Sequence, residues 1–228
     1  MRDGSLEPIH TRVAQVEDDG SRFSIRVVSS LTRRATAARG GDPFMPPYAP
    51  GLFVGEISAT HVSLLNKYPV LDHHALIITR AFEPQTSPLT EADFAAVLPL
   101  LHAAGGLVFY NSGAEAGASQ PHKHLQWVPR PADARLRAPL PFVHASGPTP
   151  SRADEALALY RRLLEKSGAY NLLLTRESML LVPRKVERFE GVSLNALAFA
   201  GSLFVKNDEE LARLVHAGPT RALQAVTG

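Results

Sequence analysis

The most informative stretch of the sequence is Asn111-Ser112-Gly113-Ala114-Glu115-Ala116-Gly117-Ala118-Ser119-Gln120-Pro121-His122-Lys123-His124-Leu125-Gln126. Its last part, continued to residue 128, is typical of a β-strand. Side chains alternate between the two faces of a strand, so His122, His124 and Gln126 share one face. Lys123 takes the opposite face. We therefore expect two imidazoles and one carboxamide to line a single wall.

The loop that precedes the histidines is built from small residues. The positions with little or no side chain are Gly113, Gly117, Ala118 and Ser119. Because so little bulk surrounds the backbone there, its N–H groups are able to approach an anion closely. The loop therefore predicts a phosphate site beside the histidine pair.

The chemistry available to this wall is nucleophilic. A neutral imidazole is able to attack phosphorus, since a pKa of about 6.5 leaves one ring nitrogen unprotonated at neutral pH while a carbonyl fixes the other N–H. Gln126 adds an NH₂ donor that holds a phosphate oxygen without titrating. The pattern predicts covalent nucleotidyl-histidine chemistry.

Two alternatives compete with this interpretation. Paired histidines on a strand are also typical of a metal site, because imidazole is a common neutral ligand. Residues 125–132 contain neither an acid nor a further histidine, which weakens that interpretation. In the second alternative both histidines are satisfied in the core, but a neighbouring Gly and Ser loop favours exposure.

Outside this stretch, the hydrophobic pattern predicts strands that alternate with irregular connections. The proline-rich residues 40–50 predict a loop, because proline cannot donate to a strand ladder. Residues 129–150 are rich in proline and lack periodicity, which predicts a surface connection without helix or strand. The predicted strands cover about 22–28, 52–57, 61–65, 75–80, 106–111, 122–128, 170–175, 178–182 and 196–205.

Three helices are expected from capping signals. Thr90 and Asp93 resemble a capping box, as do Ser151 and Asp154. The helices should cover about 90–104, 151–167 and the residues from 207 to a break at Gly218. This order of elements favours an antiparallel α+β layer fold over alternating βαβ units. We expect one domain over residues 1–228, with a proline-rich connection at about 129–150.

Composition excludes several classes of protein. The 228 residues contain no cysteine, so disulfides and thiolate metal sites are unavailable, which fits a reducing cytoplasm. The polar N-terminus indicates no targeting segment. The apolar window 196–205 is shorter than the roughly 20 residues that cross a bilayer. A net charge of +2, with basic and acidic residues interleaved, favours an anionic ligand over a nucleic-acid surface.

The motif His122-x-His124-x-Gln126, preceded by Gly117-Ala118-Ser119-Gln120-Pro121, resembles the transferase branch of the histidine-triad superfamily. Specifically, it is similar to the ATP adenylyltransferase family, also called diadenosine tetraphosphate phosphorylase. From about residue 22 onward, further segments resemble the family in order: 66–70, 84–90, 109–113, 170–175 and 195–206. The resemblance implies a histidine-triad-like antiparallel sheet flanked by helices.

The resemblance also implies residue roles. His124 would be the nucleophile that carries AMP, flanked by His122 and Gln126. Gln126 stands where hydrolytic members have a third histidine, a replacement that accompanies transfer instead of hydrolysis. His74 matches a histidine that supports the triad, and Arg34 is the nearest match to a phosphate-contacting lysine of fungal relatives. The other residues implied to contact nucleotide or phosphate are Asn66, Lys67, Asn111, Gly117, Ala118, Ser119, Gln120, Asn195, Gly201 and Lys206.

Several of these residues also have purely structural interpretations. Lys67 and Lys206 are also typical of solvated surface charges. Asn111 and Asn195 are also typical of turns, and Gly201 of a bend in a strand. The sequence leaves both interpretations open.

The function implied by the resemblance is phosphorolysis of diadenosine tetraphosphate to ADP and ATP, or the reverse ATP adenylyltransferase reaction, through an AMP–histidine intermediate. The alternatives are a hydrolase that releases AMP to water and a nucleotide-binding module without turnover. The expected partners are diadenosine tetraphosphate, ATP, ADP and phosphate, with neither nucleic acid nor membrane, and we expect a monomer. No tightly bound cofactor is expected, although Mg²⁺ would accompany the polyphosphate.

Overall fold

The computed structural model describes residues 6, 11–28, 41–129, 136, 140–164 and 168–228. Its centre is an eight-stranded sheet in the order β3-β4-β5-β7-β6-β9-β10-β8, in which every neighbouring pair is antiparallel. The strands are β3 Phe53–Glu56, β4 His61–Leu65, β5 Ala75–Thr79, β6 Leu107–Asn111, β7 His124–Val128, β8 Ala145–Gly147, β9 Ala169–Leu174 and β10 Met179–Arg184.

Two smaller sheets and several helices complete the fold. One sheet combines β1 Arg12–Asp18, β2 Ser21–Val27 and β13 Ser202–Val205, with β13 parallel to β2. The other is a ribbon of β11 Arg188–Phe189 and β12 Val192–Ser193. The helices are α2 Glu91–Ala104, η1 Ala114–Ala116, α3 Ala153–Leu163, α4 Ala196–Phe199, α5 Asp208–Ala217 and α6 Pro219–Val226.

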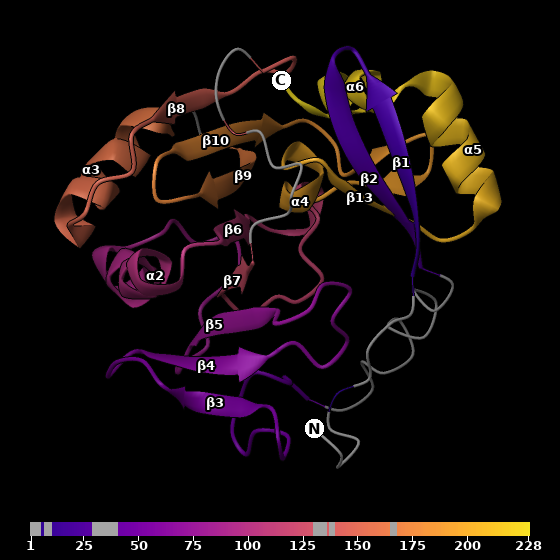
Figure 1. Cartoon of the computed structure of the whole chain (residues 1–228). Helices are drawn as coiled ribbons and strands as arrows, with labels where there is room; N and C mark the ends of the chain where they lie inside the picture. The colour runs from indigo at the N-terminus through magenta and orange to yellow at the C-terminus, as the bar shows by residue number, and fades with distance from the viewer. Residues whose placement is uncertain (1–5, 7–10, 29–40, 130–135, 137–139, 165–167) are drawn as a thin grey trace.

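The large sheet is covered differently on its two faces (Figure 1). Helices α2 and α3 cover one face, where Val108, Leu125 and Leu172 belong to their hydrophobic core. Helix α4, the β1-β2-β13 sheet and the C-terminal helices cover the opposite face around β6, β9 and β10. A small cluster that includes Phe44 and Ile78 covers β4 and β5. Strand β7 therefore lies at the middle of the sheet, between these groups.

The predicted α+β class is confirmed, and so are several local predictions. Strand β4 has the predicted bounds, and β9 and β10 form the predicted hairpin. The capping box of α2 is present in both directions, since the Thr90 side chain accepts from the Asp93 N–H and the Asp93 carboxylate accepts from the Thr90 N–H. Gly105, with φ of 68°, ends the helix as expected.

The prediction of one strand over 196–205 is wrong. Asn195 caps the short helix α4, because its side chain accepts from the Leu197 N–H. Gly201, with φ of 83°, then turns the chain into β13. A short continuous apolar run does not distinguish a buried helix from a strand by periodicity, and this run contains both.

Other boundaries also need correction. The connection 129–150, predicted to lack elements, contributes the edge strand β8. Ser151 does not cap α3, whose N-cap is Arg152 without a side-chain hydrogen bond, and the helix ends at Leu163. Strand β1 and helix α6 were not predicted, the latter because Pro219 breaks α5 but also occupies the first turn of a new helix. Among the described residues no helix is long and apolar enough to cross a membrane.

Candidate active site

The predicted wall of side chains lies on one face of β7 and the residues just before it. In the sheet register, His124 pairs with Ile78, while Gln126 pairs with Phe109 on the other side of β7. His122 precedes the strand and forms an isolated bridge with Pro84, so β7 begins two residues later than predicted. All three members of the motif are buried, and His124 is only 3% exposed.

Gln85 separates β6 from β7 at the end that holds His124. The register of the two strands places Asn111 opposite His124, but the two residues are bridged by the Gln85 carboxamide. Its oxygen accepts from the His124 N–H at 2.8 Å, and its nitrogen donates to the Asn111 carbonyl at 2.7 Å and the His124 carbonyl at 3.2 Å. The side chain thus replaces the missing ladder bonds and fixes the backbone of His124.

His122 is held by partners at both ring nitrogens. Its Nδ1 lies 2.7 Å from Oδ2 of Asp42, and its Nε2 lies 2.8 Å from the Thr79 carbonyl oxygen. The Phe44 ring packs edge-on against both His122 and His124. Because both of its nitrogens are engaged, His122 has none available to attack phosphorus.

His124 differs from His122 in this respect. Its Nδ1 lies 2.8 Å from the His122 carbonyl oxygen, which can only accept, so Nδ1 carries the proton. Nε2 is then the nitrogen with the lone pair, and it forms no hydrogen bond with any described residue. Burial lowers the pKa of His124 to about 4, an effect that the hydrogen bond to His122 partly offsets. The ring is therefore neutral at physiological pH.

A directed chain of hydrogen bonds orients Gln126. The Tyr68 N–H must donate, so the oxygen of the Asn66 amide faces Tyr68 and its NH₂ faces Nδ1 of His74. His74 therefore carries its proton on Nε2, which donates to Oε1 of Gln126 at 2.9 Å. The NH₂ group of Gln126 is left at the free end of the amide, where it is able to donate to a phosphate oxygen.

The loop between β6 and β7 has two kinds of N–H group. Those of Gly117 and Ala118 bond inside the loop, to the carbonyls of Ala114 and Gly113. The N–H groups of Ser119 and Gln120 form no hydrogen bond with described residues. Gly117 and Ala118 therefore shape the predicted anion site, and the donors open to a ligand belong to the next two residues.

Gly117 is required by its surroundings as well as by its backbone. Its φ of +88° disfavours any residue with a side chain, and a Cβ atom would lie 2.9 Å from the Leu194 carbonyl oxygen and 2.9 Å from Cβ of Asn195. The segment before α4 thus supports the loop from behind. Asn195 reaches this region as the cap of α4 and as a wall for Gly117.

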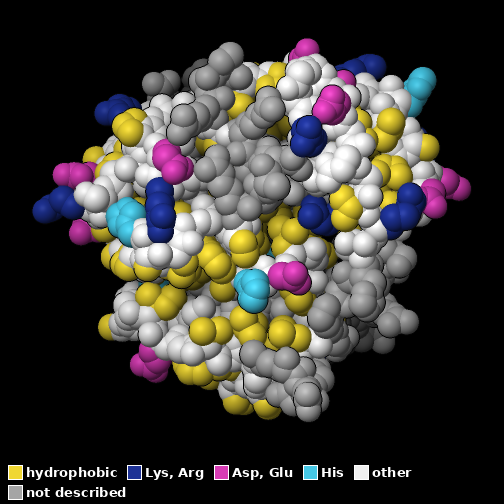
Figure 2. Space-filling view, viewed as in Figure 1, with side chains coloured by type: hydrophobic (Ala, Val, Ile, Leu, Met, Phe, Trp, Pro, Cys, Tyr) yellow, Lys and Arg dark blue, Asp and Glu magenta, His cyan; other side chains and the backbone are white. Residues whose placement is uncertain are grey.

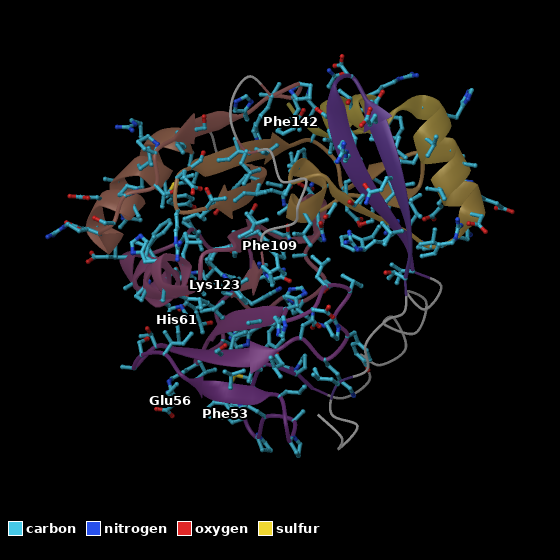
Figure 3. The ribbon with its side chains drawn as sticks, in the orientation of Figure 1. Phe53, Glu56, His61, Phe109, Lys123 and Phe142 are labelled. Atoms are coloured by element: carbon cyan, nitrogen blue, oxygen red, sulfur yellow. The ribbon has the colours of Figure 1, made fainter. Side chains whose placement is uncertain are left out.

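The opposite face of the motif holds a buried charged cluster. Lys123 is 1% exposed, and its Nζ lies 2.8 Å from Glu83 and 3.1 Å from Asp93. The other oxygen of Asp93 lies 3.0 Å from Nε2 of His61. Burial alone would raise the pKa of Asp93, but the hydrogen bonds from His61 and Thr90 and the charge of Lys123 hold it below its ordinary value. Figure 3 shows Lys123 and His61 on the α2 side of the sheet.

The remaining predicted site residues lie outside β7, and each has its own local contacts. Lys67 is exposed with its Nζ 5.3 Å from the centre of the Tyr68 ring, next to Asn66. Lys206 follows β13, with its Nζ 3.9 Å from Glu210 of α5. Gly201 accepts from the Ser24 N–H and forms a turn, which is a structural role. Arg34 lies outside the described residues.

Three buried or partly buried residues of the site were missed at the level of sequence. Asp42 contacts His122, Gln85 holds the backbone of His124, and Arg184 donates to Asn171 and to backbone carbonyls behind the loop. Asp42 stood in a stretch predicted only as an irregular loop. Gln85 lay in the segment 84–90 that resembles the family but was given no role, and Arg184 belongs to no segment named from the sequence. Their partners are distant in sequence, so spacing gave no signal.

Among the described residues no group of three or more His, Cys, Asp or Glu side chains could hold a metal ion. Lys and Arg side chains are scattered over the visible face of the molecule and do not gather into one patch (Figure 2).

Comparison with known proteins gives matches over nearly the whole chain. The sequence profile of the Ap4A phosphorylase N-terminal domain matches residues 1–145, and that of the ATP adenylyltransferase C-terminal domain matches residues 138–227. The two profiles meet inside the proline-rich connection, whereas the large sheet takes strands from both parts. A single domain over residues 1–228 stays a prediction.

Individual relatives come from Saccharomyces cerevisiae. Protein APA1 is 26% identical over 271 residues, covering 92% of this chain and 84% of that protein. Diadenosine 5',5'''-P1,P4-tetraphosphate phosphorylase 2 is 24% identical over 278 residues, covering 93% and 86%. The crystal structure of yeast Ap4A phosphorylase Apa2 in complex with AMP matches with a TM-score of 0.78 and 25% identity, covering 97% of this chain and 90% of that chain.

Proposed function

This chain belongs to the Ap4A phosphorylase and ATP adenylyltransferase family, and on that premise we propose that it is a nucleotidyltransferase that converts diadenosine tetraphosphate and phosphate into ADP and ATP, and the reverse. The name of its yeast relative, a diadenosine tetraphosphate phosphorylase, and the AMP complex of yeast Apa2 support this substrate class. The histidine wall on β7 supports a two-step route through AMP bound to His124.

In the first step, Nε2 of His124 attacks the α-phosphorus of diadenosine tetraphosphate. A nitrogen–phosphorus bond forms, and the bond from phosphorus to the bridging oxygen breaks, so that ATP leaves. Nδ1 keeps its proton throughout, and the positive charge that develops on the ring is stabilised by the His122 carbonyl oxygen at 2.8 Å. The phosphate oxygens carry negative charge, which hydrogen bonds donated by the NH₂ group of Gln126 and the N–H groups of Ser119 and Gln120 would stabilise.

In the second step, an oxygen of orthophosphate attacks the same phosphorus from the opposite side. The phosphorus–nitrogen bond breaks, ADP forms, and His124 returns to its neutral state with a lone pair on Nε2. A protonated Nδ1 makes the ring a good leaving group, since the ring is cationic while it carries AMP and becomes a neutral imidazole when it takes back the electron pair of the phosphorus–nitrogen bond. The same hydrogen bond therefore serves both steps.

One observation carries this proposal. Three histidines, at positions 74, 122 and 124, point to this wall, and two of them have partners at both ring nitrogens. Within the described part of the chain, His124 alone among them has a nitrogen without a hydrogen bond. A lone pair beside a small-residue loop with open N–H groups fits attack on a phosphate ester.

Three further features belong to the proposal. Mg²⁺ would be held by the oxygens of the polyphosphate, where it lowers the negative charge that faces the nucleophile. We also propose a cytoplasmic setting, because a chain without cysteine suits a reducing compartment. We propose that the enzyme acts as a monomer, which sedimentation velocity would test.

The decisive experiment asks whether AMP from the substrate becomes bound to the protein. The protein is mixed with diadenosine tetraphosphate labelled at the α-phosphorus, quenched in base, and digested for mass spectrometry. We expect an acid-labile AMP adduct on His124, and its absence from wild-type protein that consumes substrate would overturn the covalent route.

A second arm separates this function from its alternatives. The products of diadenosine tetraphosphate are resolved with and without orthophosphate. A phosphorylase gives ADP and ATP only when phosphate is present, and labelled phosphate appears in ADP. Release of AMP without phosphate would indicate a hydrolase, and nucleotide binding without any product would indicate a binding module.

A further inference from the structure

Arg184, the last residue of β10, is a buried cation that forms no ion pair with a described carboxylate, although the charge of Glu187 partly offsets the effect of burial on its pKa. The residue is 6% exposed. Its guanidinium donates to Oδ1 of Asn171 at 2.6 Å and to the carbonyl oxygens of Leu194 and Val186 at 2.9 and 2.8 Å. Burial lowers the pKa of Arg184 to about 10, so the group stays charged at neutral pH. A buried charge of this kind is costly, which indicates that it has a specific role.

The guanidinium fixes the direction of a second series of hydrogen bonds, which runs through two side-chain amides. Arginine can only donate, so the oxygen of the Asn171 amide faces Arg184 and its NH₂ faces the other way. That NH₂ donates to Oδ1 of Asn111 at 2.8 Å, and the same oxygen accepts from the Ala196 N–H at 2.9 Å. Two donors on one oxygen fix the orientation of the Asn111 amide.

Asn111 then presents its NH₂ group on the wall that holds His124. Asn111 lies two residues beyond Phe109, which pairs with Gln126, so its side chain is on the same face of the sheet. The nitrogen of the Asn111 amide forms no hydrogen bond with any described residue. The arrangement repeats that of Gln126. There, a series of hydrogen bonds begins at the Tyr68 N–H, which can only donate, and ends at an NH₂ group that is open to a ligand.

The same guanidinium supports the loop before the histidines. The Ala116 carbonyl oxygen accepts from the Asn171 NH₂ at 2.8 Å and lies 3.5 Å from Arg184. The Leu194 carbonyl, which packs against Gly117, is also bound to Arg184. One cation therefore fixes both the loop and the amide beside it.

We propose that Arg184 is a positioning residue, which acts through Asn171 to hold the Asn111 amide with its NH₂ group toward the phosphate of the bound nucleotide. This inference rests on the proposed function, since it names the phosphate as the partner of Asn111. Reversal of the Asn111 amide would place its oxygen against the anionic phosphate, and binding would weaken. Reversal of the Asn171 amide would place two oxygens against each other at Oδ1 of Asn111 and so favour that same reversal.

The test is a double-mutant cycle that uses Asn171→Asp, which has nearly the same shape as Asn171. A carboxylate still accepts from Arg184 but cannot donate to Oδ1 of Asn111 or to the Ala116 carbonyl, so the Asn111 amide loses one of its two donors and meets a repelling oxygen. The affinity for AMP is measured by calorimetry in wild type, Asn171→Asp, Asn111→Ala and the double variant. We expect Asn171→Asp to weaken AMP binding roughly 10- to 100-fold in wild type and by a clearly smaller factor in the Asn111→Ala background, where only the loop contact with the Ala116 carbonyl is lost.

An equal loss in both backgrounds would overturn the proposal, since Asn171 would then act without Asn111. Two Arg184 variants give an independent arm if Asn171→Asp unfolds. Arg184→Lys keeps an obligate donor and should retain most of the affinity per folded molecule, whereas Arg184→Gln, which presents either an oxygen or a nitrogen, should lose it. Equal affinities for these two variants would contradict the directional role.

The binding readout also separates this inference from the proposed function. Wild-type protein that binds AMP but forms no ADP or ATP from diadenosine tetraphosphate would refute the phosphorylase activity, while the cycle of AMP affinities would still decide the role of Arg184. If the wild-type protein catalyses phosphorolysis but Asn171→Asp weakens AMP binding equally in both backgrounds, only the role of Arg184 would be refuted.

Discussion

The two faces of the segment from His122 to Gln126 bury polar groups in opposite ways. On the α2 side, the charge of Lys123 meets the carboxylates of Asp93 and Glu83. On the other side, the His124 ring is neutral and meets a backbone carbonyl, and the nearby carboxylate of Asp42 contacts His122 instead. One face pairs a buried ammonium group with carboxylates, and on the other face the His124 ring itself is held by a directed hydrogen bond between neutral groups.

This difference follows from what each face must do. A balanced set of buried charges is stable only while no member changes its charge, so the α2 side is suited to holding the strand. In the proposed mechanism His124 gains positive charge when it takes up AMP, and a hydrogen bond to a carbonyl permits this because it strengthens as the ring becomes positive. Substitutions on the two faces should therefore affect different measurements.

The largest effect is expected for His124→Ala. Removal of the nucleophile should lower the rate of phosphorolysis per folded molecule on the order of 10⁴-fold or more, and the cavity left by the buried ring should lower the free energy of unfolding by about 2 kcal/mol. Initial rates and urea unfolding would measure the two quantities. The matched control is His102→Ala, an exposed histidine of α2, which should retain the wild-type rate within about 2-fold. A substantial residual rate in His124→Ala would point to another nucleophile.

The second largest effect tests the α2 side. Lys123→Met leaves Asp93 buried without its cation and should lower the free energy of unfolding by about 3 to 5 kcal/mol. The rate per folded molecule should change less than about 3-fold. In the double variant with Asp93→Asn, which removes both charges, part of the lost stability should return. Strictly additive losses in urea unfolding would mean that the two residues are not coupled.

The third prediction concerns pH and the face that holds His124. The pKa of His124 is about 4 in the folded state and about 6.5 when unfolded. Between these values only the unfolded chain takes up the proton, so this contribution to stability is present above pH 6.5 and is lost as the pH falls toward 4. The loss should be about 3 kcal/mol. Urea unfolding of wild type and His124→Ala across this range would measure it, and parallel curves would contradict it.

The smallest effect is expected for His74, which donates to Gln126. In His74→Asn the new side chain is too short to reach Gln126. The Gln126 amide would then lose its fixed orientation, and kcat/KM should fall about 10-fold. The neighbouring His73 is exposed and has a φ of 57°, which asparagine also tolerates, so His73→Asn is the matched control. Equal values of kcat/KM for the two variants would remove His74 from the site.

Much of the site could be predicted from the sequence because its central part is local. The alternation of His122, His124 and Gln126 along one strand fixed their common face, and the glycines before them indicated a turn with exposed N–H groups. The cap of α2 was also local, since Thr90 and Asp93 are three residues apart.

The rest could not be predicted because it depends on contacts between distant segments. The contact between Asp42 and His122 joins residues 80 positions apart, and no periodic pattern records such a pair. Arg184 lies two residues beyond the strand predicted over 178–182, and only the packing of the Leu194 segment and the loop against it makes it a buried donor. The apolar run around Ala198 satisfied both helix and strand patterns, so its course was decided by its surroundings.

The Gln85 bridge has a consequence for protein engineering. A chimaera that exchanges the loop between β6 and β7 with that of a relative would be joined at residues 112 and 123, close to the ends of the two strands. The Gln85 carboxamide that joins β6 and β7 comes from a segment outside the exchanged loop. A loop taken from a relative with a different residue at that position would therefore be attached to strands whose separation does not fit it. Grafts should therefore carry the residues around Gln85 together with the loop.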